Sequence, residues 1–238
     1  MSIISKETIQ RLLKDVKSII KSPLTDNGIY YEHDDEDMMK GYAMIVGPED
    51  TPYYGGYYFF EFNFPLDYPH SPPKVIFCTN SENIRFNPNL YTSGKVCVSL
   101  LNTWRGDQWT SCQTIGTVLL TLCSLLCKNP LLNEPGTSIC NRDLKNYNEI
   151  IEFSNINIAI CDIVNKKLDV FLNKFHRFYP VVKEIFLLNY PKYVDFIENK
   201  KKLSPCRLKT DFYRLDVVID YEKLLGKIKE TLELIDCK

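Results

Sequence analysis

Charge of one sign and long apolar runs are both scarce in this sequence. Lys and Arg number 29 against 30 Asp and Glu, which leaves a formal net charge of −1 over 238 residues. A chain without a strong overall field does not attract nucleic acid or an anionic membrane, so any partner is recognised locally. The longest nearly apolar stretch, residues 118–127, is about half of the ~20 residues that a membrane-spanning helix needs. We therefore expect no nucleic-acid partner and no membrane span.

The first twenty residues lack the continuous apolar segment of a secretory signal. Lys, Glu, Arg and Asp interrupt the Ile and Leu residues throughout this stretch, whereas a signal peptide needs an uninterrupted apolar core. The sequence therefore predicts a protein of the cytoplasm or the nucleus.

Histidine is also scarce, and the cysteines have no framework spacing. Only three histidines are present, and none is at metal-ligand spacing from a cysteine pair. The nine cysteines are an odd number and lie scattered along the chain. These patterns favour reduced thiols over a disulfide framework, and they argue against a zinc site.

The first third of the chain predicts a helix followed by antiparallel strands. Apolar residues recur at helical spacing over residues 9–20, and Ser5 is a candidate N-cap. Strands are predicted over residues 29–33, 39–46, 57–64 and 74–77. The acidic run 34–37 is predicted to be a solvated hairpin turn, because like charges repel and prefer water.

A long loop and then mostly helices are predicted for the rest. Residues 79–103 have little periodicity, and a loop of that length is usually functional or disordered. The apolar stretch that follows predicts a buried helix, with Ser111 as candidate N-cap and Asn129-Pro130 as its end. Beyond Gly136 the apolar spacing indicates helices, one of them over residues 170–197, with a linking loop at residues 200–209.

Cys97 differs from the other cysteines because it lies in the long loop, near Asn89 and Lys95. The thiolate is the reactive form of cysteine, and a nearby ammonium group with main-chain amides would ease its formation. Cys123 and Cys127 lie inside the apolar helix, where cysteine acts as a small buried hydrophobe. A loop cysteine is structural more often than catalytic, so these arguments leave both roles open for Cys97.

Several motifs resemble the ubiquitin-conjugating enzyme family in order and spacing. They are Gly47-Pro48, Thr51-Pro52-Tyr53, Gly55-Gly56, Tyr68-Pro69, Pro72-Pro73-Lys74, Asn87-Pro88-Asn89 eight residues before Cys97, and Trp109. A narrower likeness, to one subgroup, rests on residues 94–97, Trp104, residues 133–136 and residues 146–149. The resemblance implies an α+β ubiquitin-conjugating fold, a four-stranded antiparallel meander packed on helices. Residues 1–136 would be the catalytic core, and residues 137–238 a helical C-terminal extension packed on it.

The resemblance also implies the chemistry. Cys97 would accept ubiquitin or a ubiquitin-like modifier from an activating enzyme as a thioester and yield it to a lysine amine of a protein substrate, usually with a ligase. Asn89 would donate a side-chain N–H to the oxyanion of transfer or hold the loop that does so; an asparagine that only forms a turn is the alternative. No cofactor is implied, since ATP is used by the upstream activating enzyme.

This sequence departs from the family pattern at some positions. Asn87 stands where the family usually has a histidine that braces the loop, and we expect activity to survive this change. Glu134 or Asn133 would serve as the gate that orients the incoming lysine, with Asp107 as a weaker candidate.

The resemblance also places the partner-contact residues. On the first helix, Lys6, Arg11 and Lys14 would meet the activating enzyme, although a solvated helix face is the plain alternative. His70 stands where many members present a phenylalanine to ligases, and Ser111-Cys112 replaces a Pro-Ala pair in the second contact loop. Both changes argue against ordinary ligase recognition.

Two other functions are compatible with the fold or the cysteine. A non-catalytic ubiquitin-binding scaffold would keep the fold and transfer nothing, but the presence of both Cys97 and Asn89 speaks against it. A cysteine hydrolase needs a positioned histidine base, and no histidine lies in or beside the long loop. The sequence therefore favours the conjugating enzyme.

Overall fold

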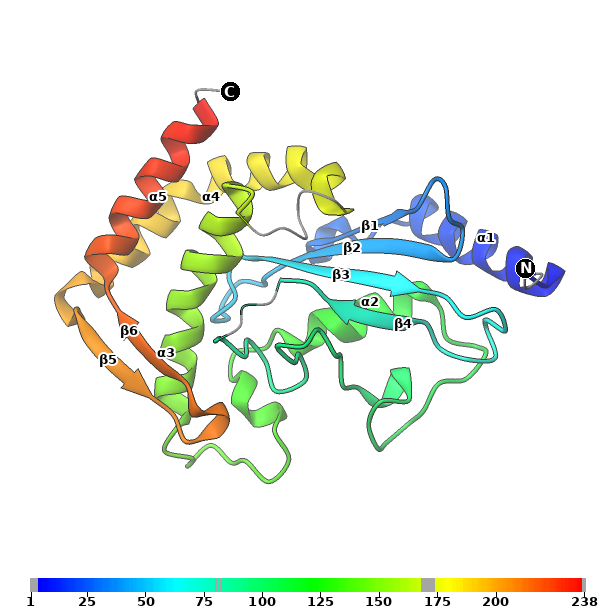
Figure 1. Cartoon of the computed structure of the whole chain (residues 1–238), viewed down its shortest axis with the longest axis horizontal. Coiled ribbons are helices and arrows are strands. Elements are labelled where there is room, and N and C mark those ends of the chain that lie inside the picture. Colours follow the sequence, from blue (N-terminus) through cyan, green and yellow to red (C-terminus); the bar gives the residue numbers. More distant parts are fainter. Residues whose placement is uncertain (1–3, 80, 82, 168–173, 237–238) are drawn as a thin grey trace.

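The computed structural model describes residues 4–79, 81, 83–167 and 174–236 (Figure 1). Its main sheet is an antiparallel meander in the order β1-β2-β3-β4, as the sequence predicted. The strands are β1 (Ile29–His33), β2 (Lys40–Val46), β3 (Tyr57–Asn63) and β4 (Lys74–Phe77). Two predicted strands were one residue too long, since β2 begins after Met39 and β3 ends before Phe64. The acidic run 34–37 forms the connection between β1 and β2, as expected.

The sheet is covered on both faces, which explains why β3 is aromatic without an alternating polar pattern. Tyr57 to Phe62 are all buried, and successive side chains of a strand point to opposite faces. On one face, Phe60 packs beside its cross-strand partner Phe77 of β4, 5.5 Å away between ring centroids, and both are buried. Phe59 points the other way and lies 4.7 Å from Phe175, beyond residue 137.

The first two helices differ in how well the sequence predicted their ends. Helix α1 (Lys6–Lys21) begins after Ser5, whose side chain accepts a hydrogen bond from Thr8 N at 3.0 Å, so the predicted N-cap is confirmed. Helix α2 (Ile115–Leu125) begins later and ends earlier than expected. Ser111 as N-cap was wrong, because Thr114 caps the helix by accepting from the backbone N–H of Thr117 at 3.2 Å. The helix also ends before Asn129-Pro130.

The described residues after Gly136 form helices and a hairpin. The helices are α3 (Leu144–Ser154), which continues as a π-helix (Asn155–Asp162), then α4 (Tyr179–Lys200) and α5 (Tyr221–Asp236). The predicted helix over residues 170–197 was misplaced at its start; residues 170–173 lie outside the described residues, and α4 begins at Tyr179. The predicted linking loop at residues 200–209 was wrong at its end, where β5 (Cys206–Lys209) pairs with β6 (Asp216–Ile219) in a hairpin.

Short 3₁₀ turns connect these elements. In the described residues they are Thr25–Asn27, Ser99–Leu101, Pro130–Asn133, His176–Phe178, Lys201–Leu203 and Phe212–Arg214, the last with a non-helical backbone at Tyr213. In Figure 1, α1 lies at one end of the sheet, while α3, α5 and the β5–β6 hairpin gather at the other end. The two termini are therefore far apart.

Buried hydrogen bonds join residues 137–238 to the sheet. Asn155, at the start of the π-helix, accepts from the Tyr58 hydroxyl at 2.7 Å and donates to the Tyr54 carbonyl at 2.9 Å. The Tyr57 hydroxyl donates to the carbonyl of Val182 on α4 at 3.0 Å. A Cβ atom on Gly56 would lie 1.8 Å from Asn155 Oδ1, so only glycine permits this approach. The extension thus packs on the sheet through specific polar contacts, while the division at residue 136 stays a prediction.

The structure can be compared with two further predictions, reduced cysteines and no membrane-spanning helix. Eight cysteines in the described part of the chain are free, and Cys237 lies outside it. Within residues 4–79, 81, 83–167 and 174–236, no helix combines the length and the apolar character needed to cross a membrane.

Candidate active site

Asn87 fixes the start of the loop that leads to Cys97. Its side chain is fully buried. Its Oδ1 accepts from the backbone N–H of Asn89 at 2.9 Å, and its Nδ2 donates to the Tyr53 hydroxyl at 3.0 Å and to the Leu125 carbonyl at 2.8 Å. Because Leu125 is the last residue of α2, this one amide ties the loop to the end of the buried helix. Asn87 therefore braces the loop in this chain.

Asn89 is hydrogen-bonded to both main-chain groups of Cys97, its carbonyl and its N–H. The Nδ2 atom of Asn89 donates to the Cys97 carbonyl at 2.6 Å, and the Asn89 carbonyl accepts from the Cys97 backbone N–H at 2.9 Å. Asn89 Oδ1 is buried without a hydrogen-bond partner among the described residues. Of the two roles left open by the sequence, the geometry displays the loop-holding one; donation to an oxyanion stays a prediction.

Cys97 is buried, with 4% of its surface exposed. Its thiol donates a hydrogen bond to the Thr103 carbonyl at 3.2 Å. Lys95, from the same loop, is exposed, and its Nζ lies 5.5 Å from the ring centroid of Tyr91. The predicted help from Lys95 in forming the thiolate stays a prediction.

Other cysteines have environments that oppose ionisation. Burial raises the pKa of Cys78 to about 12 and that of Cys161 to about 12, and it also raises the pKa of Cys123. The thiolate is the nucleophile, so these shifts oppose formation of the reactive form.

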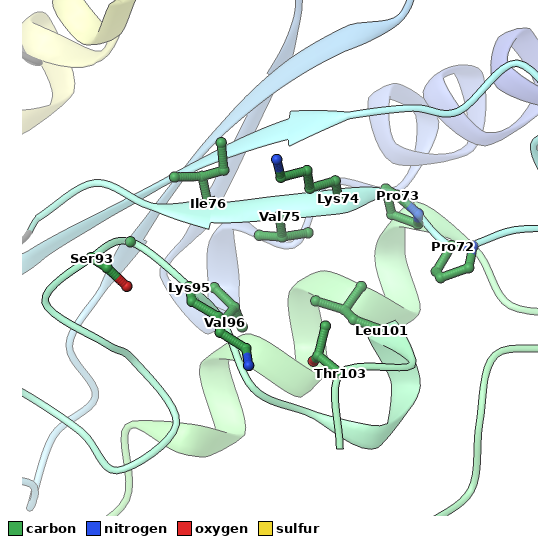
Figure 2. A pocket seen from close by; sticks show the side chains of 11 residues that line it. Pro72, Pro73, Lys74, Val75, Ile76, Ser93, Lys95, Val96, Leu101 and Thr103 are labelled. Atoms are coloured by element: carbon green, nitrogen blue, oxygen red, sulfur yellow. The ribbon is translucent and has the colours of Figure 1, made fainter. Parts of the chain in front are cut away.

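An open cavity of about 440 Å³ borders the Cys97 loop (Figure 2). Its walls come from the edge strand β4 and the preceding prolines, and from two short segments that flank Cys97 in the sequence. The lining residues are Pro72, Pro73, Lys74, Val75, Ile76, Ser93, Gly94, Lys95, Val96, Leu101 and Thr103. Phe77 N donates to the Gly94 carbonyl at 2.8 Å, so the loop is hydrogen-bonded to the end of β4. The cysteine loop is thus firmly attached to the sheet beside an accessible groove.

The two candidate gate residues point to different neighbours. Asn133 turns toward the end of α2, where its Nδ2 donates to the Leu125 carbonyl at 3.2 Å. Glu134 accepts a hydrogen bond from the hydroxyl of Tyr213, which belongs to the turn between β5 and β6. Asp107, the weaker candidate, is exposed. The structure therefore links Glu134 to the extension.

Arg85 and Tyr213 contact residues 87–89 and the candidate gate Glu134, respectively, and the sequence did not single them out. The guanidinium carbon of Arg85 lies 3.6 Å from the ring centroid of Tyr91 and 4.4 Å from that of Tyr213. An Nη2–H of Arg85 donates to the carbonyl of Pro88, between the two asparagines of the loop, at 2.5 Å. Arg85 could have been noticed, because it is a cation just before the Asn87-Pro88-Asn89 motif. Tyr213 has no sequence signal that connects it to this site.

Comparison with known proteins decides the family. Residues 11–155 match the family model described as ubiquitin-conjugating enzyme. The chain belongs to the ubiquitin-conjugating enzyme family. It is similar to ubiquitin-conjugating enzyme E2 Z of Danio rerio, with 37% identity over 228 residues, which are 94% of this chain and 68% of that protein. The subgroup likeness in the sequence is thereby confirmed.

Other relatives share shorter parts of the chain. E2 Z of Homo sapiens is 44% identical over 164 residues, which are 68% of this chain and 46% of that protein. A probable ubiquitin-conjugating enzyme of Caenorhabditis elegans is 34% identical over 209 residues, which are 82% of this chain and 28% of that protein. The match to the Danio rerio protein extends beyond the family model and includes the extension.

In this ubiquitin-conjugating enzyme, the predicted activating-enzyme contacts on α1 are of two kinds. Lys6 and Lys14 are exposed. Arg11 is only 17% exposed in its side chain and donates to Asp15 Oδ1 at 2.9 Å and to the Ser111 carbonyl at 2.5 Å. Arg11 thus ties α1 to the loop before α2, whereas the two lysines are free to reach a partner.

The two predicted ligase-contact loops lie side by side. Trp109 Nε1 donates to the carbonyl of Pro69 at 2.7 Å, which joins the Pro-rich loop to the segment before α2. His70 is exposed, and its Nε2 lies 3.4 Å from Glu7 Oε1 on α1. Ser111 and Cys112 are exposed as well. These residues form an accessible surface, and their role in ligase binding stays a prediction.

The described residues contain no group of three or more His, Cys, Asp or Glu side chains arranged to hold a metal ion.

Proposed function

We propose that this ubiquitin-conjugating enzyme carries ubiquitin or a ubiquitin-like modifier as a thioester on Cys97 and transfers it to a lysine amine. The observation that supports the proposal is the network in which Asn87 braces Asn89, and Asn89 holds both main-chain groups of Cys97. The network fixes a nucleophile and an amide N–H within one loop, as acyl transfer requires.

Charging is a thioester exchange. The Cys97 sulfur, having lost its proton, attacks the carbonyl carbon of the thioester on the activating enzyme, and the thiolate of that enzyme leaves with the electron pair of the broken C–S bond. One C–S bond forms and one breaks, so the step is close to balanced in energy. ATP is consumed upstream, and this chain needs no cofactor of its own.

Transfer converts the thioester to an amide. The lysine nitrogen attacks the carbonyl carbon, and the carbonyl oxygen takes the negative charge of the tetrahedral intermediate. Collapse of this intermediate breaks the C–S bond and expels the Cys97 thiolate with the electron pair, and the proton that the nitrogen loses passes to the thiolate or to water. An N–H of Asn89 would stabilise the oxyanion, while Glu134 or Asn133 would orient the amine. A ligase would bring the protein substrate.

Burial of Cys97 favours a second candidate, a ubiquitin-binding scaffold that transfers nothing. Cys97 is only 4% exposed, and its thiol donates a hydrogen bond to the Thr103 carbonyl, so in this conformation it is poorly placed to attack an acyl carbon. The two functions differ in whether the chain ever holds ubiquitin covalently.

A charging assay separates the two functions. The protein is incubated with activating enzyme, ATP and ubiquitin and analysed on non-reducing gels. We expect a band that reductant removes in the parent and a reductant-resistant oxyester in Cys97→Ser. Cys140→Ser, which changes an exposed thiol of the extension, is the matched control and should charge as the parent does. Reductant-sensitive charging in Cys97→Ala, or no charging in the parent, would contradict the proposal.

A further inference from the structure

The turn between β5 and β6 is fixed to the body of the protein. Asp143, which is 6% exposed, accepts hydrogen bonds with one carboxylate oxygen from the backbone N–H groups of Asp211 at 2.7 Å and Phe212 at 2.9 Å. A buried carboxylate that accepts two backbone N–H groups is a strong anchor. The chain is therefore held firmly at the residue that precedes Tyr213.

Tyr213 has an unusual backbone and a defined hydroxyl partner. Its φ is +59°, and the next residue, Arg214, has a φ of +50°. Two successive residues other than glycine in the left-handed region cost conformational energy, which is tolerated where the surroundings fix the geometry. Burial and the charge of Glu134 raise the pKa of Tyr213, so its hydroxyl stays protonated and donates to that carboxylate.

The ring of Tyr213 contacts the cation that holds the catalytic loop. Arg85 lies over the rings of Tyr91 and Tyr213 and donates to the Pro88 carbonyl. Cation–π contacts orient a guanidinium group as well as attract it. A carbonyl between Asn87 and Asn89 is therefore held by a cation that a residue of the extension orients.

We propose that Tyr213 is a positioning residue for the transfer step, acting on the active site through two groups at once. Its ring orients Arg85 against the loop of Asn89, and its hydroxyl fixes the carboxylate of Glu134. The inference rests on the proposed function, because it assigns these residues a part in transfer from Cys97. It makes the extension a component of the active site and not only a cover for the sheet.

The test measures single-turnover discharge of the isolated thioester to free lysine. Tyr213→Phe keeps the ring over Arg85 and removes the hydrogen bond to Glu134. We expect discharge to slow about tenfold, the factor for one lost hydrogen bond to a charged group. Tyr190→Phe, which changes a half-buried tyrosine of α4 that packs on Phe186 at 5.8 Å, is the matched control and should discharge at the parent rate.

A double-mutant cycle shows whether Tyr213 acts through Glu134. In a Glu134→Ala background, Tyr213→Phe should slow discharge less than about twofold, because the carboxylate that it positions is gone. A hydroxyl with a merely structural role would slow both backgrounds equally, and that result would overturn the inference.

Arg85→Lys tests the contact between Arg85 and the ring of Tyr213. It also replaces Tyr213→Phe as the test if the thermal midpoint shows that Tyr213→Phe folds poorly. Lysine keeps the charge but lacks the planar fork that stacks on rings and reaches the Pro88 carbonyl. We expect discharge to slow about tenfold in this variant. Parent-like discharge in Arg85→Lys or in Tyr213→Phe, with normal charging of the parent, would overturn the inference and leave the proposed function intact. A parent that forms no thioester would overturn both.

Discussion

The thiol of Cys97 and the carbonyl of Thr103 form a hydrogen bond of 3.2 Å that closes the loop between them. Thr103 is fastened in turn to Val98, since its Oγ1 accepts from the Val98 backbone N–H at 2.9 Å and donates to the Val98 carbonyl at 3.0 Å. Cys97 is 4% exposed, so these few local hydrogen bonds hold the segment that covers its thiol.

Loosening this loop should expose the thiol. Thr103→Val removes both Oγ1 hydrogen bonds, each worth about 1 kcal/mol, and we expect alkylation of Cys97 by iodoacetamide to quicken by about fivefold or more. Mass spectrometry of the modified peptide gives the rate. Thr110→Val changes another exposed threonine of the same connection, one that does not bond to Val98, and should leave the rate as it is. An unchanged rate in Thr103→Val would mean that the loop opens by another route.

Removing the amide of Asn89 should separate charging from transfer. Asn89→Ala loses the N–H that lies 2.6 Å from the Cys97 carbonyl, and loss of an oxyanion donor costs about 100-fold in rate. We expect nearly normal charging and much slower discharge to free lysine in single-turnover assays. Asn146→Ala, which loses an exposed amide of α3 bonded to the Lys209 carbonyl, is the control. Equal discharge in Asn89→Ala and the parent would leave Asn89 as a turn residue.

The contact of the extension with the sheet should contribute to stability. Asn155→Ala leaves the buried hydroxyl of Tyr58 without its acceptor, and a buried unpaired polar group costs about 1–3 kcal/mol. Urea unfolding should show a free energy of unfolding lower by about that amount. Asn157→Ala is the control, because its partner Lys227 keeps other contacts, with the Asn157 carbonyl and Asp162. A parent-like midpoint in Asn155→Ala would contradict this account.

Stability should fall in mild acid because of His33. Burial lowers the pKa of His33 from 6.5 in the folded state, although the Met38 carbonyl and nearby acids oppose the shift. As the pH falls below 6.5, the unfolded chain therefore binds more protons than the folded one. The contribution of neutral His33 to the free energy of unfolding is complete above that pH and is lost as the pH falls.

Urea midpoints between pH 7 and pH 5 test the role of His33. The midpoint of the parent should fall more steeply than that of His33→Gln, whose side chain does not titrate. His176→Gln, at an exposed position, should follow the parent. Parallel curves for His33→Gln and the parent would show that other groups cause the loss.

Local signals predicted the meander and the first helix because they depend on near neighbours. The bounds of β4 and the Ser5 cap follow from prolines and side chains within a few residues. The start of α2 was misjudged because Ser111 precedes a better cap, Thr114, which forms a reciprocal pair with Thr117. Such an error arises where polar residues a few positions apart are each able to cap the same helix.

The hairpin of the extension and the role of Tyr213 depend on distant contacts. Strand β5 has four residues, and its alternation of Cys206 and Leu208 with Arg207 and Lys209 is too short to outweigh the surrounding lysines and Pro205. Cys97 and Asn89 could be proposed from the sequence because they lie eight residues apart in a motif that resembles the family. Tyr213 meets Glu134 across 79 residues, a separation at which sequence spacing holds no information.

The hydrogen bond from Tyr57 to Val182 spans 125 residues, which has a consequence for synthesis of the chain. A ribosome adds about 5–20 residues per second. About ten seconds therefore pass between synthesis of Tyr57 and synthesis of Val182. During this interval the nascent sheet presents Phe59 without Phe175 to cover it. A bare aromatic face of this kind is a target for chaperones, and final docking must wait until α4 has left the exit tunnel.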